Sequence, residues 1–283
     1  MARKVFATTI KNNVRSIVFL LSVVAVLMFF INDASGWREQ STHWSASEFH
    51  KAMANFALMP LRYAVPVFIG ITASVDIMRD KKNKAFDIIK TTSLKTHQYF
   101  FAKVFAYLLM GFICELALSY GHFIIYYFIV DRMEGYDYSV LESVWMIFLR
   151  AAVFALNSVP IYVSVAVAAS LITSSSIAGI TSCVALVAYG IIGMPYFTRT
   201  FLGDYVFPVA DHIENYMYFY KTHLFPEDIL YIPVSNVLVS FAIEAAICIV
   251  LFSLGYILIH DHCFSMRFWK QSTIKTKKQQ SER

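Results

Sequence analysis

The sequence has few charged residues and little glycine for its length. Only 15% of its 283 residues are charged, 58% are hydrophobic and 10 are glycine. Because about a quarter of the residues in a soluble domain are charged, this composition excludes an ordinary soluble protein and indicates an integral membrane protein. The net charge of +5 gives no signal for nucleic-acid binding, because the basic residues are distributed as the predicted membrane topology requires.

The sequence also lacks the short motifs that carry common catalytic and nucleotide-binding chemistry. It contains no G-x-x-x-x-G-K phosphate loop, no H-E-x-x-H, no C-x-x-C and no G-x-S-x-G. None of the four cysteines lies in a candidate exterior loop, so we expect no disulfide. We therefore expect a chain that is not an enzyme and that binds no metal or cofactor itself.

Hydropathy predicts an all-α fold in one transmembrane domain, 1–283, because no linker or repeat divides the chain. A helix needs about 20 apolar residues to cross a bilayer. Residues 151–198 include no charge and are too long for one crossing, so we expect a reversal at 173–176. Six spans result: 16–31, 53–78, 104–130, 143–172, 177–197 and 234–260.

Charge alternates from loop to loop along these spans. Segments 1–15, 79–103 and 261–283 hold 17 of the 24 Lys and Arg residues and 4 of the 19 acidic residues. The intervening loops hold 5 Lys and Arg and 12 acidic residues. Since basic loops stay in the cytoplasm, both termini are predicted to lie on the cytoplasmic side of a plasma membrane. The lysine-rich, glycine-poor composition favours a bacterial membrane.

Two segments outside the predicted spans have compositions typical of structures at the membrane surface. Residues 1–15 predict an interfacial amphipathic helix, with Val5, Phe6 and Ile10 facing lipid and basic residues facing headgroups. Exterior segment 199–233 is acidic, rich in aromatics and divided by prolines. It is either an aromatic belt at the membrane surface or a re-entrant segment of short helices before the last span.

The loop 79–103 combines basic and apolar side chains. It holds seven Lys and Arg residues together with the apolar Ala85, Phe86, Ile88 and Ile89. Apolar side chains in a polar loop need a surface to cover them. We expect this loop to dock onto another protein; alternatively, its apolar residues lie on the membrane surface.

Four charged residues lie within predicted spans: Arg62, Glu115, Arg150 and Glu244. A charge at the bilayer centre costs about 2.5–3.5 kcal/mol on insertion scales, so each needs a partner or water. At about 1.5 Å per residue, Glu115 lies roughly 17 Å from the inner end of its span. Either an arginine pairs with a glutamate to fix the packing, or these groups line a substrate or proton path.

The order of these parts resembles the permease subunits of ABC-2-type transporters. That family often carries an acidic residue at the end of its second span, then a short motif, then a lysine that opens the third span. Here Asp76 and Asp80 are the acidic candidates, 86–94 reads FDIIKTTSL, and Lys103 stands at the opening. The matching topology covers the whole chain.

The resemblance implies a cytoplasmic coupling helix at 84–92 that sits in a groove of an ABC ATPase. Its coupling residues would be Lys84, Ala85, Phe86, Ile88 and Ile89, with Phe86 and Ile89 as anchors. Two ATPase subunits would bind ATP and Mg, and a second permease chain, identical or related, would complete the pathway in the lipid bilayer. Export from the cell is the expected direction.

Two other classes remain open from the residues alone. One is a carrier that works by itself, coupled to ions or protons through Glu115 and Glu244. The other is a membrane scaffold or sensor without a transport activity. Transport in ATP-free vesicles favours the first class, and the absence of any ATPase partner favours the second.

Overall fold

The structure is a computed structural model that describes residues 2–15, 23–28, 31–32, 63–83, 85, 89, 94–130, 144–189, 239 and 241–260. These residues are helical apart from short turns, and no strand occurs among them. The expected all-α class is therefore confirmed for this part of the chain. The segment 199–233, predicted to be re-entrant, lies outside it.

Three stretches of the described helices are long and apolar enough to cross a membrane. They are Thr96–Gly121, Ala155–Thr173 and Phe241–His260. These stretches support a membrane protein. The count of six spans stays a prediction, because much of the first and second expected spans lies outside the described residues. The helices are α1 (Ala2–Val14), α4 (Val65–Lys82), α6 (Thr96–Val130), α7 (Val144–Thr173), α8 (Ser176–Ala188) and the C-terminal helix Phe241–His260.

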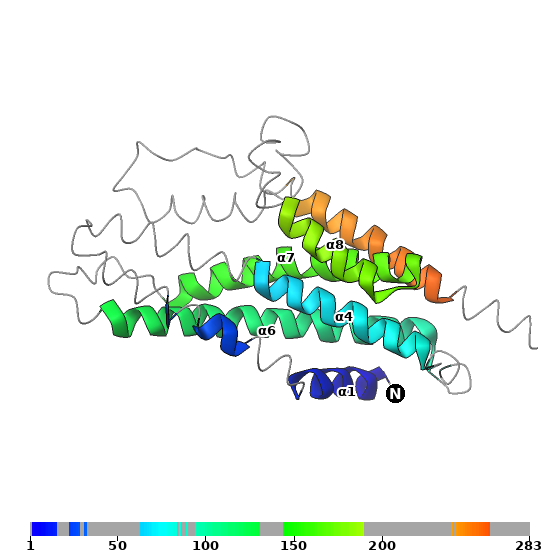
Figure 1. Cartoon of the computed structure of the whole chain (residues 1–283), viewed down its shortest axis with the longest axis horizontal. Coiled ribbons are helices and arrows are strands. Elements are labelled where there is room, and N and C mark those ends of the chain that lie inside the picture. The colour runs from blue at the N-terminus through cyan, green and yellow to red at the C-terminus, as the bar shows by residue number, and fades with distance from the viewer. Residues whose placement is uncertain are drawn as a thin grey trace, which may run out of the picture.

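Helix α7 lies at the centre of the described bundle, in contact with α4, α6 and α8 (Figure 1). Helix α1 packs on α6 at the opposite side from α8 (Figure 1). The C-terminal helix contacts α6 and α7. Its Tyr256 packs near Phe100 of α6, and its Cys248 Sγ accepts a hydrogen bond from Ser164 Oγ of α7 at 3.7 Å. The core between α4, α6 and α7 includes the fully buried Ile69 and Val159.

The predicted reversal at 173–176 is confirmed. Helix α7 ends at Thr173, and Ser174 takes a positive φ of 57° that turns the chain back. The Ser175 side chain then caps α8 by accepting a hydrogen bond from the Ile177 backbone N–H at 3.3 Å. A charge-free stretch of this length has room for two antiparallel helices, and a serine-rich turn supplies the cap.

Helical structure extends into the polar loop that was predicted between the second and third spans. Helix α4 continues to Lys82 and α6 begins at Thr96, eight residues before the predicted span. Residues 83–95 connect the two helices. Hydropathy marks the apolar part of a helix, whereas these helices continue through charged residues that are bound to one another. The limits of the two membrane spans stay a prediction.

Two of the three apolar residues of α1 that were predicted to face lipid pack inside the protein instead, and the place of Phe6 stays a prediction. Val5 and Ile10 pack against the hydrophobic core, and Thr9 is buried. The basic Lys4, Lys11 and Arg15 are exposed, as an amphipathic helix requires. The prediction failed because an apolar stripe is buried against the nearest apolar surface, which here is α6.

Candidate functional site

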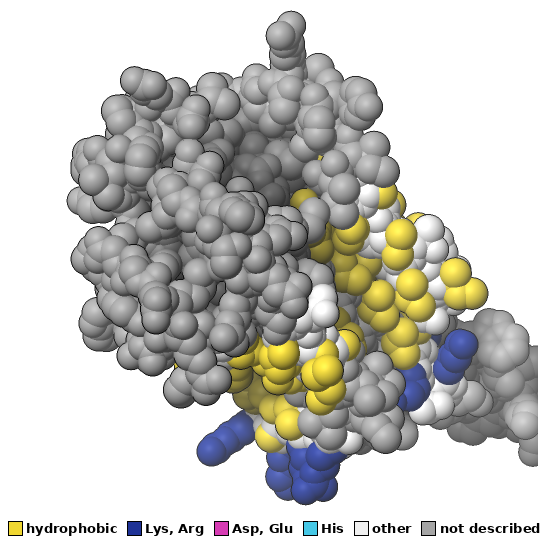
Figure 2. Space-filling model, turned by 60° about the vertical axis from the view of Figure 1, so that its left-hand side comes forward, with side chains coloured by type: hydrophobic (Ala, Val, Ile, Leu, Met, Phe, Trp, Pro, Cys, Tyr) yellow, Lys and Arg dark blue, Asp and Glu magenta, His cyan; other side chains and the backbone are white. Residues whose placement is uncertain are grey.

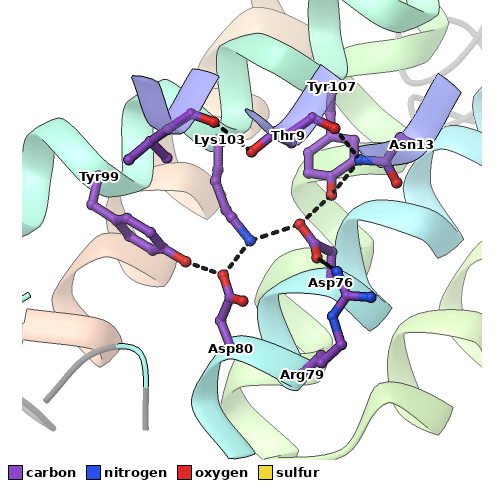
Figure 3. Close-up of polar contacts among 9 residues, drawn as sticks. Thr9, Asn13, Asp76, Arg79, Asp80, Tyr99, Lys103 and Tyr107 are labelled. Atoms are coloured by element: carbon purple, nitrogen blue, oxygen red, sulfur yellow. Dashed lines mark hydrogen bonds and ion pairs between the residues drawn. The ribbon is translucent and has the colours of Figure 1, made fainter. Parts of the chain in front are cut away.

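Two aspartates near the end of α4 bind one lysine of α6. Asp76 and Asp80 are four residues apart, so they lie on successive turns of one side of α4. Lys103 Nζ donates to Asp76 Oδ2 at 2.6 Å and also binds Asp80 Oδ2 (Figure 3). Asp76 and Lys103 are each 6% exposed. The lysine therefore ties α4 to α6 next to the 83–95 connection.

Hydroxyl groups of α6 complete the coordination of both carboxylates. The Tyr107 hydroxyl donates to Asp76 Oδ2 at 2.6 Å, and the Tyr99 hydroxyl donates to Asp80 (Figure 3). Asn13 Nδ2 of α1 donates to the Tyr107 hydroxyl oxygen at 3.2 Å. Three helices that are far apart in the sequence thus meet at one network.

Arg79 supplies the second positive charge. It donates to Asp76 Oδ1 from the next turn of α4, but its side chain is 59% exposed, against 8% for that of Lys103. Two carboxylates and two cations give these four groups no net charge. We call the set of Asn13, Asp76, Arg79, Asp80, Tyr99, Lys103 and Tyr107 the Lys103 cluster.

The two cations of the Lys103 cluster differ in how much they contribute to the free energy of unfolding. Removing one partner of a buried ion pair costs about 3–5 kcal/mol, because the other charge stays buried without compensation. An exposed ion pair contributes about 0–1 kcal/mol, because water screens it. Lys103 therefore holds α4 and α6 together, whereas Arg79 adds little.

Basic side chains gather around the cluster at one end of the bundle. Figure 2 shows dark-blue Lys and Arg side chains at one end of the visible face, next to a band of hydrophobic ones. Lys81 Nζ donates to Ser174 Oγ at 2.8 Å, which brings the turn between α7 and α8 to the same end. Lys82 and Lys95 border the 83–95 connection and are exposed. We call this part of the molecule the basic end.

A second group of polar side chains follows the same ridge of α6. Every fourth residue along the helix from Tyr99 is polar or glycine and buried, and neighbours at this spacing are adjacent on the helix surface. The next ridge carries exposed apolar side chains, with Phe105 at 59% exposure. The buried ridge consists of Tyr99, Lys103, Tyr107, Gly111, Glu115 and Ser119.

Glu115 and Ser119, farther along this ridge, have no partner like those of Lys103. Glu115 is 0% exposed and Ser119 1%. Neither carboxylate oxygen of Glu115 nor the Ser119 hydroxyl has a hydrogen-bond partner within the described part of the chain. Lys103 is twelve residues away, roughly 18 Å along the helix. Its attraction at that distance is about 1 kcal/mol, below the several kcal/mol that burial of an ion costs.

Gly111 separates the two polar groups and sits tightly against α7. A Cβ atom built on Gly111 would lie 2.5 Å from Val159 Cγ1 and 2.9 Å from Cγ2. Such distances are shorter than any ordinary contact, so only glycine allows this approach of α6 to α7. Small residues at helix contacts are typical of helices packed in membranes.

The other predicted intramembrane charges fall in different places. Glu244 is 3% exposed, on the C-terminal helix one turn before Cys248. Arg150 lies on α7 by its backbone, but its side chain is outside the described atoms. Arg62 is outside the described residues. Whether an arginine pairs with Glu115 or Glu244 stays a prediction.

The predicted coupling residues are described only in part. Ala85 and Ile89 have helical backbones, whereas Lys84, Phe86 and Ile88 lie outside the described residues. Ile89 is 7% exposed and belongs to the hydrophobic core. Its docking role stays a prediction, and the buried side chain makes Ile89 a poor position for testing it.

The sequence pointed to the charged members of the Lys103 cluster without joining them. Arg79 and Lys103 counted as basic residues of the loop, and Asp76, Asp80 and Lys103 were also matched to the family motif. Tyr99, Tyr107 and Asn13 were not singled out. The available signal was the four-residue spacing shared by the aspartates and by Tyr99, Lys103 and Tyr107.

Comparisons of the chain with known protein families and with curated proteins find no match. What the site does is therefore inferred from its own geometry. A balanced, buried ion cluster has no free group for acid–base or nucleophilic chemistry. It can fix α4 to α6. A movement of the 83–95 connection would then be transmitted to both helices.

Proposed function

We propose that this chain is the permease subunit of an ATP-driven exporter of the ABC-2 type, placed in the plasma membrane. Its partners would be two ATPase subunits that bind ATP and Mg, and a second permease chain. The observation that carries the proposal is the Lys103 bridge to Asp76 and Asp80. It joins the two helices that flank the segment expected to meet the ATPase.

The bridge gives the 83–95 connection a mechanical role. When the ATPases close around ATP, the segment docked in them moves as a rigid body. Because α4 and α6 are tied at Lys103, both helices tilt together rather than separating. That motion opens a cavity between two permease chains toward the outside, for a cargo that is amphipathic or lipid-like.

The geometry of the basic end supports this arrangement. Exposed lysines border the connection on both sides, and the turn between α7 and α8 is bound there by Lys81. A basic end faces the cytoplasm by the usual charge rule for membrane proteins. A maleimide that cannot cross membranes should therefore label Lys95→Cys in inside-out vesicles and leave it unlabelled in intact cells.

The test of the proposal is ATP hydrolysis that copurifies with the tagged chain from its own cells. We expect a Mg-dependent ATPase to accompany the wild type and to be lost from Phe86→Asp. Lys95→Gln, an uncharged change at the end of the same connection, is the matched control and should retain it. If no ATPase accompanies the wild type, or if Phe86→Asp retains it, the proposal is wrong.

One observation favours a second candidate, a proton-coupled carrier that works alone. Glu115 is fully buried within an apolar helix and has no described partner. Buried acidic residues of this kind serve as proton relays in carriers. Transport by the purified chain in ATP-free vesicles, driven by a pH gradient, would establish this candidate in place of the exporter.

A further inference from the structure

We propose that Glu115 and Ser119 form a proton-binding site inside the bundle, occupied by a proton in the arrangement seen here. The site is separate from the Lys103 cluster and does not depend on the ATPase partner. Its ligand is a proton and no larger cation.

The first step is the accessibility of the carboxylate. Each oxygen of Glu115 has less than 1 Å² of exposed surface, as does the Ser119 hydroxyl oxygen. A water molecule touches none of these atoms, so a metal ion or an ammonium group would require the helices to separate. A proton is the one cation that binds such an oxygen without additional space.

The second step is the absence of a compensating charge in the described part of the chain. The charged groups of α1 are exposed, and those of α4 are exposed, bound to Ser174 or part of the Lys103 cluster. On its own helix, the described titratable neighbours of Glu115 are Cys114 and Tyr120, and neither side chain can carry a positive charge. The C-terminal helix contributes an acidic residue at Glu244, which cannot compensate a carboxylate. The described side chains of α7 that are polar near this depth, Asn157 and Ser158, are uncharged.

The third step is the position of Ser119, one turn from Glu115 on the same ridge. Residues at this spacing are neighbours on a helix surface. A protonated carboxyl group has one O–H donor and an ionised one has none, whereas a hydroxyl both donates and accepts. The Ser119 hydroxyl can therefore accept a hydrogen bond from Glu115 when the carboxyl group holds a proton.

The fourth step is how the proton leaves. Gly111 holds α6 against Val159 of α7, one turn before Glu115. Any movement that loosens this contact lets water reach the carboxyl group, and the proton is then released to it. The site thus exchanges its proton in an opened arrangement and keeps it in the closed one.

Labelling of the detergent-solubilised full-length protein with dicyclohexylcarbodiimide tests the proposal. A protonated carboxyl group adds across one C=N bond of this apolar reagent: its oxygen bonds to the central carbon and its proton moves to a nitrogen. The acyl group then shifts to nitrogen and gives a stable N-acylurea, with nothing released and nothing oxidised. Mass spectrometry of the peptide carrying residue 115 detects the adduct.

We expect an adduct on the wild-type peptide, no adduct in Glu115→Gln, and an unchanged adduct in the matched control Glu244→Gln. The proposal is overturned if the wild-type peptide stays unlabelled and Glu115→Gln also has a much lower unfolding temperature than the wild type. It is also overturned if labelling appears only in Arg62→Gln or Arg150→Gln, because Glu115 would then be an ion held by that arginine.

A second measurement keeps the proposal testable if Glu115 is hard for the reagent to reach. Glutamine has the shape of a protonated glutamate and, like it, carries a hydrogen-bond donor, so Glu115→Gln should retain the wild-type unfolding temperature in detergent. Glu115→Lys should lower it. A large loss in Glu115→Gln would mean that the ionised form is the one bound. Neither result depends on an ATPase, so the exporter proposal stands or falls separately.

Discussion

The two polar groups on the buried ridge of α6 differ in how their charges are compensated. In the Lys103 cluster, each carboxylate is bound by at least one cation and one tyrosine hydroxyl. About 18 Å farther along, Glu115 and Ser119 are as deeply buried and have no described hydrogen-bond partner. The first arrangement is suited to holding helices together, whereas the second is suited to binding something that comes and goes.

The largest effect should come from removing the cation of the compensated group. Lys103→Met leaves the buried Asp76 and the partly buried Asp80 without their shared partner. We expect a loss of about 3–5 kcal/mol in the free energy of unfolding. Unfolding of the purified chain by SDS in mixed micelles measures it.

The matched control for this change is Arg79→Gln, which removes the other cation bound to Asp76. Because that side chain is mostly exposed, we expect a loss of at most about 1 kcal/mol. Equal losses for the two variants would mean that burial does not distinguish the two ion pairs.

A smaller effect should follow from removing one hydroxyl of the cluster. Tyr107→Phe deletes the donor to Asp76 and the acceptor of Asn13, and hydrogen bonds to charged groups contribute about 1.5–3 kcal/mol. We expect a loss in that range by the same unfolding measurement. Tyr256→Phe, on the C-terminal helix, is the control and should change stability little; a similar loss there would remove the special role of Tyr107.

The packing between the two groups is tested at Gly111. A methyl group there meets Val159, and overpacking of this kind costs about 1–3 kcal/mol. We expect Gly111→Ala to lower the unfolding temperature. Gly121→Ala, where the nearest atom is Leu27 Cδ2 at an ordinary 3.5 Å, should not. Equal tolerance at both positions would show that α6 and α7 do not approach as closely as described.

The smallest effect is expected at the uncompensated group. Glu115→Gln should change the free energy of unfolding least of all, because an amide replaces a neutral acid of the same shape and both carry a hydrogen-bond donor. The same acid-to-amide change at Asp76 should cost clearly more, because Lys103 loses a charged partner. If the two amide variants behave alike, the two groups do not differ as the structure indicates.

Parts of the fold were predictable from the sequence because they depend on local features. The absence of charge over 151–198, together with a serine-rich turn, predicted the reversal between α7 and α8. The places of Glu115 and Glu244 within apolar helices followed from the apolar runs around them. These features depend on residues that are close together in the sequence, so hydropathy and turn-forming residues predict them.

Other parts were missed because they depend on contacts between segments. Hydropathy placed Lys103 in a loop, since a lone lysine gives no sign that two aspartates 23 and 27 residues earlier will bind it. The same contacts explain why α6 begins at Thr96 rather than at 104. Helix α1 was expected on lipid because its packing partner cannot be read from its own residues.

The most direct test of the account is a double-mutant cycle between Asp76 and Lys103. Unfolding free energies are measured for the wild type, Asp76→Asn, Lys103→Met and the double variant. The account predicts a coupling energy above about 1 kcal/mol, with the double variant less damaged than the two single losses together imply. Additivity within about 0.5 kcal/mol would contradict a buried ion pair that joins α4 to α6.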